Sequence, residues 1–172
     1  MDEVVLTRSL QERFPGIVVS SFSAIAIGTG QMADSLRVQM QHTGNSSAPQ
    51  TLIAKIPKNN EASRAASRIT RCYEVETSFY SEISSSVEAR IPECYHVEYS
   101  KHDDEFLLLL EDLAPARQGD QLGGCGVDDA ILAVTEMAKL HGSLWNSPST
   151  NDKEWLIRNR SDAGKNTLQL LQ

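Results

Sequence analysis

The chain has 172 residues, of which 40% are hydrophobic and 23% are charged, the balance of an ordinary globular protein with one compact core. The formal net charge of -7 argues against non-specific nucleic-acid binding, because neutralising phosphates requires a basic stripe and the lysines and arginines are not clustered. No apolar run approaches roughly 18 residues, and the start lacks the pattern of a secretory signal, so we expect a cytoplasmic protein without a membrane span. The cysteines form no C-x-x-C pair, which indicates neither a disulfide framework nor a zinc site.

The first elements expected along the chain are a short helix and a β-hairpin. Residues 2–14 carry apolar side chains at helical spacing, and Pro15-Gly16 ends that pattern. Residues 17–27 are rich in Val, Ile, Phe and Ser and predict a strand. After Gly28-Thr29-Gly30, apolar and polar residues alternate from residue 36 to residue 41, as in a strand with one wet face. We therefore expect the glycines to lie in a hairpin turn.

The next strand and helix each carry one charge in an apolar setting. Residues 50–58 predict a strand in which Lys55 lies among apolar neighbours, and a buried ammonium needs an anionic partner. Residues 61–87 predict a helix, and Glu76 falls in the middle of its apolar stripe. The economical solution is that Lys55 and Glu76 meet. The alternatives are a lysine that reaches solvent and a glutamate beyond the covered part of the helix.

Two more strands, a connector and a helix complete the pattern. Residues 95–99 alternate, and residues 106–110 are continuously apolar, as in a strand covered on both faces. Residues 114–126 are rich in glycine and form the best candidate for a domain boundary. Residues 128–145 predict a strong amphipathic helix whose apolar face must pack on something, with His141 packed or half-buried. The chain then ends on apolar residues, Leu168, Leu170 and Leu171.

The pattern Gly28-x-Gly30-x-x-Ala33 is shared by two different phosphate-binding structures. In a dinucleotide-binding unit the glycines open a helix. In the other structure, a glycine hairpin folds over nucleotide phosphates, and the missing side chains let backbone N–H groups approach them. The alternating strand after Ala33 favours the hairpin, although a flexible turn without a ligand would show the same residues.

Taken in order, these elements resemble the N-terminal lobe of the protein-kinase-like fold, and in detail the aminoglycoside phosphotransferase and choline/ecdysteroid kinase-like group. The resemblance covers residues from about 5 to 157 and rests on five segments, residues 27–38, 52–57, 76–80, 109–113 and 137–145. It implies an α+β fold in which an antiparallel five-stranded sheet and one long helix form an N-lobe over residues 1–113. Residues 114–126 would be a hinge, and residues 127–172 the first helical part of an incomplete C-lobe.

The resemblance also implies ATP and Mg²⁺ as cofactors and an unidentified small-molecule acceptor. The implied nucleotide-binding positions are Gly28, Thr29, Gly30, Lys55, Glu76, Glu111, Asp112 and Leu113. The lysine would hold the ATP phosphates, the glutamate of the helix would pair with it, and the glycine hairpin would cover the phosphates. The adenine edge would meet backbone groups of residues 111–113.

The sequence departs from the family pattern in its catalytic part. The family uses an H-x-D loop, with an Asn five residues after the Asp, and a later metal-binding Asp. His141-Gly142-Ser143 has Ser143 in place of the acid and Pro148 at the Asn position, so we expect no catalytic residue and no metal ligand in this chain.

Three functions therefore stay open. The favoured one is the ATP-binding portion of a small-molecule kinase, inactive as this chain alone. The alternatives are a non-catalytic pseudokinase module that binds nucleotide or protein, and a dinucleotide-dependent oxidoreductase, against which the strand after Ala33 argues. We expect an exposed apolar surface on the helix over residues 128–145, which predicts poor solubility or self-association of the isolated chain.

Overall fold

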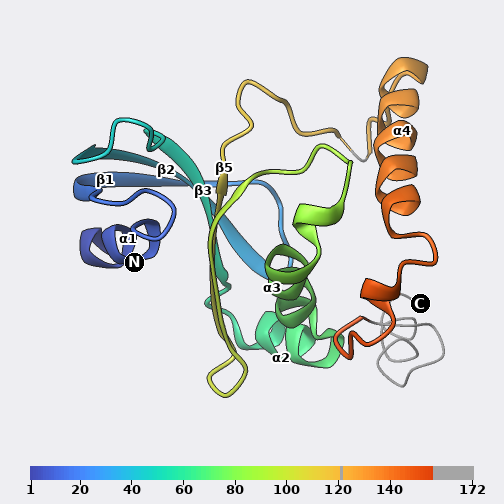
Figure 1. Ribbon diagram of the computed structural model, residues 1–172, viewed down its shortest axis with the longest axis horizontal. Coiled ribbons are helices and arrows are strands. Elements are labelled where there is room, and N and C mark those ends of the chain that lie inside the picture. The colour runs from blue at the N-terminus through green and yellow to red at the C-terminus, as the bar shows by residue number, and fades with distance from the viewer. Residues whose placement is uncertain (121, 157–172) are drawn as a thin grey trace.

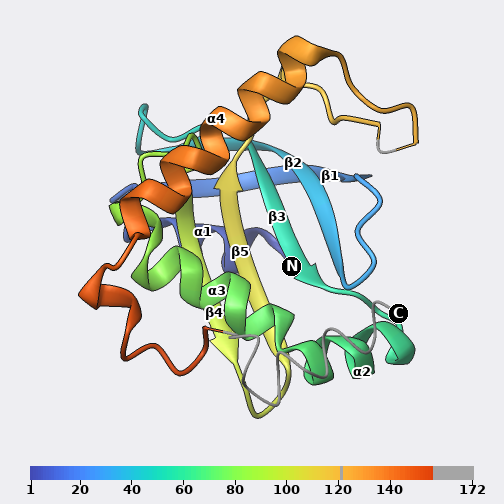
Figure 2. The same cartoon turned by 90° about the vertical axis from the view of Figure 1, so that its right-hand side faces the viewer.

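A computed structural model describes residues 1–120 and 122–156 as one five-stranded antiparallel sheet with helices on both faces (Figure 1). The strand order is β1-β2-β3-β5-β4, as Figure 2 shows face-on. The helices and strands are α1 (Glu3–Leu10), β1 (Val18–Ile27), β2 (Ala33–Thr43), β3 (Thr51–Pro57), α2 (Glu61–Thr70), α3 (Cys72–Glu82), β4 (Cys94–Ser100), β5 (Glu105–Glu111) and α4 (Val127–Leu144), with short 3-10 turns at Ser84–Ser86 and Pro148–Thr150. The predicted α+β architecture with its antiparallel five-stranded sheet is confirmed.

Helix α1 covers one face of the sheet, which we call the outer face. Asp2 caps this helix, because its Oδ1 accepts the N–H of Val5 at 2.8 Å. Leu6 and Leu10 of α1 are fully buried in a continuous apolar core with side chains from β2, β3 and β5. The strand members of that core include Val38, Met40, Leu52, Ala54 and Leu109. The outer face is therefore closed by apolar packing.

The opposite face, which we call the inner face, is covered by α3. Tyr73 of α3 packs against Phe106 of β5 with ring centroids 4.6 Å apart, and Leu108 and Leu110 join the same cluster. Leu109 belongs to the outer core instead. The apolar run over residues 106–110 is thus covered on both faces, as its composition predicts.

The helical segment predicted over residues 61–87 consists of two helices, α2 and α3, separated at Arg71. Arg71 has a left-handed backbone conformation with φ of 56°. Its N–H still bonds to the carbonyl of Ser67, and its Nε donates to Oε2 of Glu74 at 2.7 Å. The sequence shows neither Gly nor Pro at this position, so periodicity alone could not locate the break.

Helix α4 stands apart from the sheet on the side of α3 (Figure 1). Within the described part of the chain no α4 residue is buried, and its apolar side chains Ile131, Leu132, Val134 and Met137 are exposed. The expected exposed apolar surface on this helix is therefore present, whereas the expectation that His141 is packed or half-buried is wrong, because His141 is exposed. The terminal leucines, Leu168, Leu170 and Leu171, lie outside the described residues. In residues 1–120 and 122–156, no helix has the length and hydropathy that a membrane crossing requires.

Candidate functional site

The hairpin between β1 and β2 holds Gly28, Thr29 and Gly30. Gly28 has φ of +72°, a conformation that L side chains rarely adopt, and a Cβ on Gly30 would lie 2.7 Å from the carbonyl oxygen of Ala33. The hairpin and the adjoining strand ends line a hollow of about 200 Å³, to which Lys58 contributes. Lys58 Nζ donates to the carbonyl oxygen of Gly30 at 2.8 Å, so the turn is held from the end of β3.

Lys55 and Glu76 meet on the inner face. Lys55 lies opposite Leu108 of the inner cluster in the strand register, so its side chain faces α3. Its Nζ forms an ion pair and hydrogen bond with Oε1 of Glu76, and the two side chains are 23% and 33% exposed. The predicted contact between the two charges is present. An ammonium has three N–H donors, so donors remain on Lys55 for an anionic ligand.

A second ion pair joins the inner face of β2 to the residue that follows β5. Arg37, which lies between Ile25 and Ile53 in the strand register, donates from Nη2 to Oδ1 of Asp112 at 3.1 Å. Its Nε lies 2.9 Å from Oδ2 but is not aligned for a hydrogen bond. Asp112 is only 4% exposed, and its Oδ1 also accepts the N–H of Ala114 at 3.1 Å. The backbone leaving the sheet is therefore fixed to β2.

The other two positions predicted near the adenine edge, Glu111 and Leu113, differ in surroundings. The Glu111 carboxylate accepts from Nη2 of Arg90 at 2.7 Å and from the N–H of Glu93 at 3.1 Å, and the Arg90 guanidinium lowers the pKa of that carboxyl. Leu113 is exposed at the start of the connector. The Glu111 side chain is thus engaged by Arg90 and by the backbone N–H of Glu93.

A large apolar cavity opens beside Glu76. It has a volume of about 1080 Å³ and is lined by α3, by the end of α4 and by Trp155, which is buried. Tyr80 of α3 lines it one turn after Glu76. Burial raises the pKa of Tyr80 to about 12, and the negative charge of Glu76 acts in the same direction. The inner face therefore continues into an open apolar space.

Three residues near the site were not predicted from the sequence as functional positions. These are Arg37, Lys58 and Tyr73, whose hydroxyl donates to the carbonyl oxygen of Met32 at 2.6 Å. A buried tyrosine hydroxyl usually forms a hydrogen bond, so the position of Tyr73 on the apolar side of its helix could have indicated one. The sequence could not identify the acceptor, because Met32 meets Tyr73 only in the folded chain.

In residues 1–120 and 122–156, no group of three or more His, Cys, Asp or Glu side chains is placed to bind a metal ion. Cys72, Cys94 and Cys125 are free thiols.

The sequence of this chain matches a known protein family. The model of the ecdysteroid kinase-like family matches residues 28–145. The matched segment begins in the glycine hairpin and ends just after α4, so it includes Lys55, Glu76 and Asp112. No curated protein matches the chain.

Proposed function

Because the chain belongs to the ecdysteroid kinase-like family, we propose that it is the ATP-binding portion of a phosphotransferase that acts on a hydroxyl group of a small molecule. The observation that carries the proposal is the ion pair between Lys55 and Glu76 on the inner face. Lys55 lies opposite Ser35 in the strand register, and Ser35 lines the hollow of the glycine hairpin. A dinucleotide-dependent oxidoreductase would need a helix directly after the glycines, and strand β2 follows them instead.

Lys55 and the hairpin would hold the phosphates of ATP. Glu76 orients the ammonium of Lys55, whose other N–H groups are available for phosphate oxygens. The Lys55 side chain is 23% exposed, so water screens the attraction of its ammonium for an anion less than at a fully exposed lysine. Gly28, Thr29 and Gly30 would approach the phosphates with backbone N–H groups.

The base would lie on the inner face near the start of the connector. Ile25 is 60% exposed there, and Ile53 is its neighbour across Arg37 in the register. Backbone groups of residues 111–113 follow directly, and the pair of Arg37 and Asp112 fixes their position. An apolar surface next to fixed backbone donors and acceptors suits a purine ring.

We also propose that this chain alone does not transfer the phosphoryl group. Its sequence has no H-x-D loop followed by the required Asn, and Ser143 and Pro148 occupy the nearest equivalent positions. Mg²⁺, which would neutralise phosphate charge, would be carried by the nucleotide rather than by a set of acids in the described chain.

Mg-ATP binding to the 172-residue chain tests the nucleotide site. Isothermal calorimetry or the rise in Tm should detect binding by the unaltered chain, and Lys55→Met should weaken it by about tenfold or more, as expected when a charge-assisted contact to phosphate is lost. Lys101→Met is the matched control, because Lys101 is an exposed lysine in the β4–β5 turn. Equal affinity of the Lys55→Met variant and the unaltered chain would contradict the proposal.

The second candidate is a module that binds protein through α4. The exposed apolar side chains of α4, including Ile131 and Leu132, favour it, and they also support the proposal that the chain self-associates. Light scattering should show a mass that rises with concentration, and Leu132→Gln should reduce that rise. A constant monomer mass in the unaltered chain would refute self-association through α4.

A further inference from the structure

We propose that Tyr73 is a positioning residue that links the glycine hairpin to the helix carrying Glu76. The inference rests on the proposed function, because Tyr73 connects the hairpin, which would bind phosphate, to the helix whose Glu76 orients the phosphate-binding Lys55. Tyr73 itself touches no reacting group. It acts by setting the hairpin and the Lys55–Glu76 pair at a fixed separation.

Tyr73 is held in a fixed position by its burial and by its contact with the sheet. Its side chain is only 2% exposed, and its ring packs against Phe106 of the sheet with centroids 4.6 Å apart. A buried aromatic ring in such a cluster has one packed position, so its hydroxyl is presented at a fixed point. That hydroxyl donates to the carbonyl oxygen of Met32 at 2.6 Å.

The hydrogen bond from Tyr73 holds the backbone at the end of the glycine hairpin. Met32 lies two residues after Gly30, at the end of the hairpin and directly before β2. Glycines give this turn a wide choice of backbone conformations, and a donor on a carbonyl oxygen fixes the plane of that peptide, including its N–H. Lys58 does the same at the Gly30 carbonyl from the end of β3. Both contacts use carbonyl oxygens and leave the hairpin's N–H groups to other partners.

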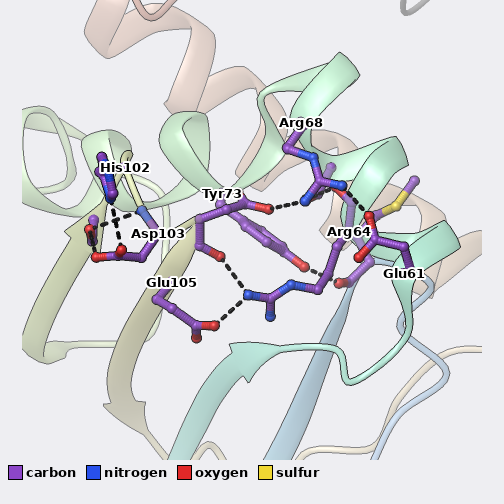
Figure 3. A network of polar contacts seen from close by, with 11 residues as sticks. Glu61, Arg64, Arg68, Tyr73, His102, Asp103 and Glu105 are labelled. Carbon is purple, nitrogen blue, oxygen red and sulfur yellow. Dashed lines mark hydrogen bonds and ion pairs between the residues drawn. The ribbon is translucent and has the colours of Figure 1, made fainter.

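Tyr73 also helps to anchor α3 to the sheet, because it is one of the two buried residues of this helix. Tyr73 and Glu76 are three residues apart on α3 and so lie on neighbouring positions of one helix face. Helix α2 is separated from α3 at Arg71. It is attached to the start of β5 and the turn before it by two ion pairs, Arg64 with Glu105 and Arg68 with Asp104 (Figure 3). In each pair at least one side chain is exposed to solvent. Such pairs contribute little to stability.

The close-up also shows how the ring is placed. Tyr73 lies beside Arg64 (Figure 3), and the hydrogen bonds of Arg64 join α2 to Asp104 and Glu105. The hydrogen bond to Met32 is therefore the described side-chain contact that passes from α3 to the hairpin backbone. Any shift of α3 that moves Glu76 also moves a fixed point of the hairpin.

Tyr73→Phe tests this link because it keeps the ring and its packing and removes only the hydroxyl. The affinity for Mg-ATP should fall by about three- to tenfold, the loss expected for one hydrogen bond, while the affinity for adenosine, which has no phosphate, stays unchanged. Without any ligand, hydrogen exchange of the amides in residues 28–33 should become faster. Tyr99→Phe is the control, because Tyr99 borders the same cluster from β4 and is remote in sequence from both elements.

Three results would overturn the inference. Unchanged affinity for Mg-ATP would exclude a role in phosphate binding, and an equal loss for ATP and adenosine would show a merely structural role. Unchanged amide exchange in residues 28–33 would refute the link to the hairpin independently of any ligand. Absence of Mg-ATP binding by the unaltered chain would instead refute the proposed function, which separates the two failures.

Discussion

The two faces of the sheet are built by the same strands and have opposite characters. On β3, Leu52 and Ala54 enter the closed apolar core under α1, whereas Ile53 and Lys55, one position along, face the inner side. The inner side carries the Lys55–Glu76 pair and opens into the large cavity beside α3. Because successive strand residues point to opposite faces, stability and binding chemistry are assigned to alternate residues of one segment.

The largest expected effect tests whether the outer face supplies the stability. Leu52 is 0% exposed, so Leu52→Ala should lower the free energy of unfolding by about 3 kcal/mol through lost burial and the cavity left behind. Urea denaturation followed by circular dichroism measures this. Ile25→Ala on the inner face is the control and should cost less than about 1 kcal/mol, because Ile25 is mostly exposed. Equal losses at both sites would remove the distinction between the faces.

A smaller loss in the free energy of unfolding is expected when the ion pair between Arg37 and Asp112 on the inner face is broken. Arg37→Ala leaves the nearly buried Asp112 carboxylate without its partner, and we expect a loss of about 2 kcal/mol, less than for a fully buried pair because Arg37 is partly exposed. A double-mutant cycle with Asp112→Asn should show strong coupling in urea denaturation. Additive losses would mean that the two side chains act independently.

The smallest effect at neutral pH is expected for Tyr80→Phe, and alkaline pH should reveal it. Burial raises the pKa of Tyr80 to about 12 from an ordinary value near 10, so the unfolded chain loses this proton first as pH rises. The stabilisation is complete below about pH 10 and is lost as pH rises toward 12. Urea midpoints of the unaltered chain should therefore fall faster than those of Tyr80→Phe across that window. Parallel curves would contradict a perturbed tyrosine on the inner face.

The sequence predicted those parts of the structure that depend on local pattern. Alternation located β2 and β4, the apolar run located β5, and the isolated charges of Lys55 and Glu76 predicted their contact, which the structure confirms. The break at Arg71 could not be predicted, because a left-handed arginine leaves no compositional mark. The Arg37–Asp112 pair also could not, since its members are 75 residues apart and meet only through the sheet order.

The surroundings of the apolar face of α4 could not be predicted from the sequence either, for a different reason. An amphipathic pattern shows that a helix has an apolar face but does not identify what covers that face. Within the described residues the face of α4 is uncovered. The nucleotide-binding roles of Gly28, Lys55 and their neighbours remain predictions that the binding experiments must test.

The left-handed conformation of Arg71 also has a consequence for how the chain opens locally. It divides what would be one hydrogen-bond ladder into two, so unwinding that starts in α2 can stop before it reaches α3. Ser67 is the residue of α2 that is buried, whereas α3 has Tyr73 and Thr77 in the core. Raised salt weakens the ion pairs of α2 but not the packing of α3. A protease added in high salt should therefore cut α2 first and leave Glu76 opposite Lys55.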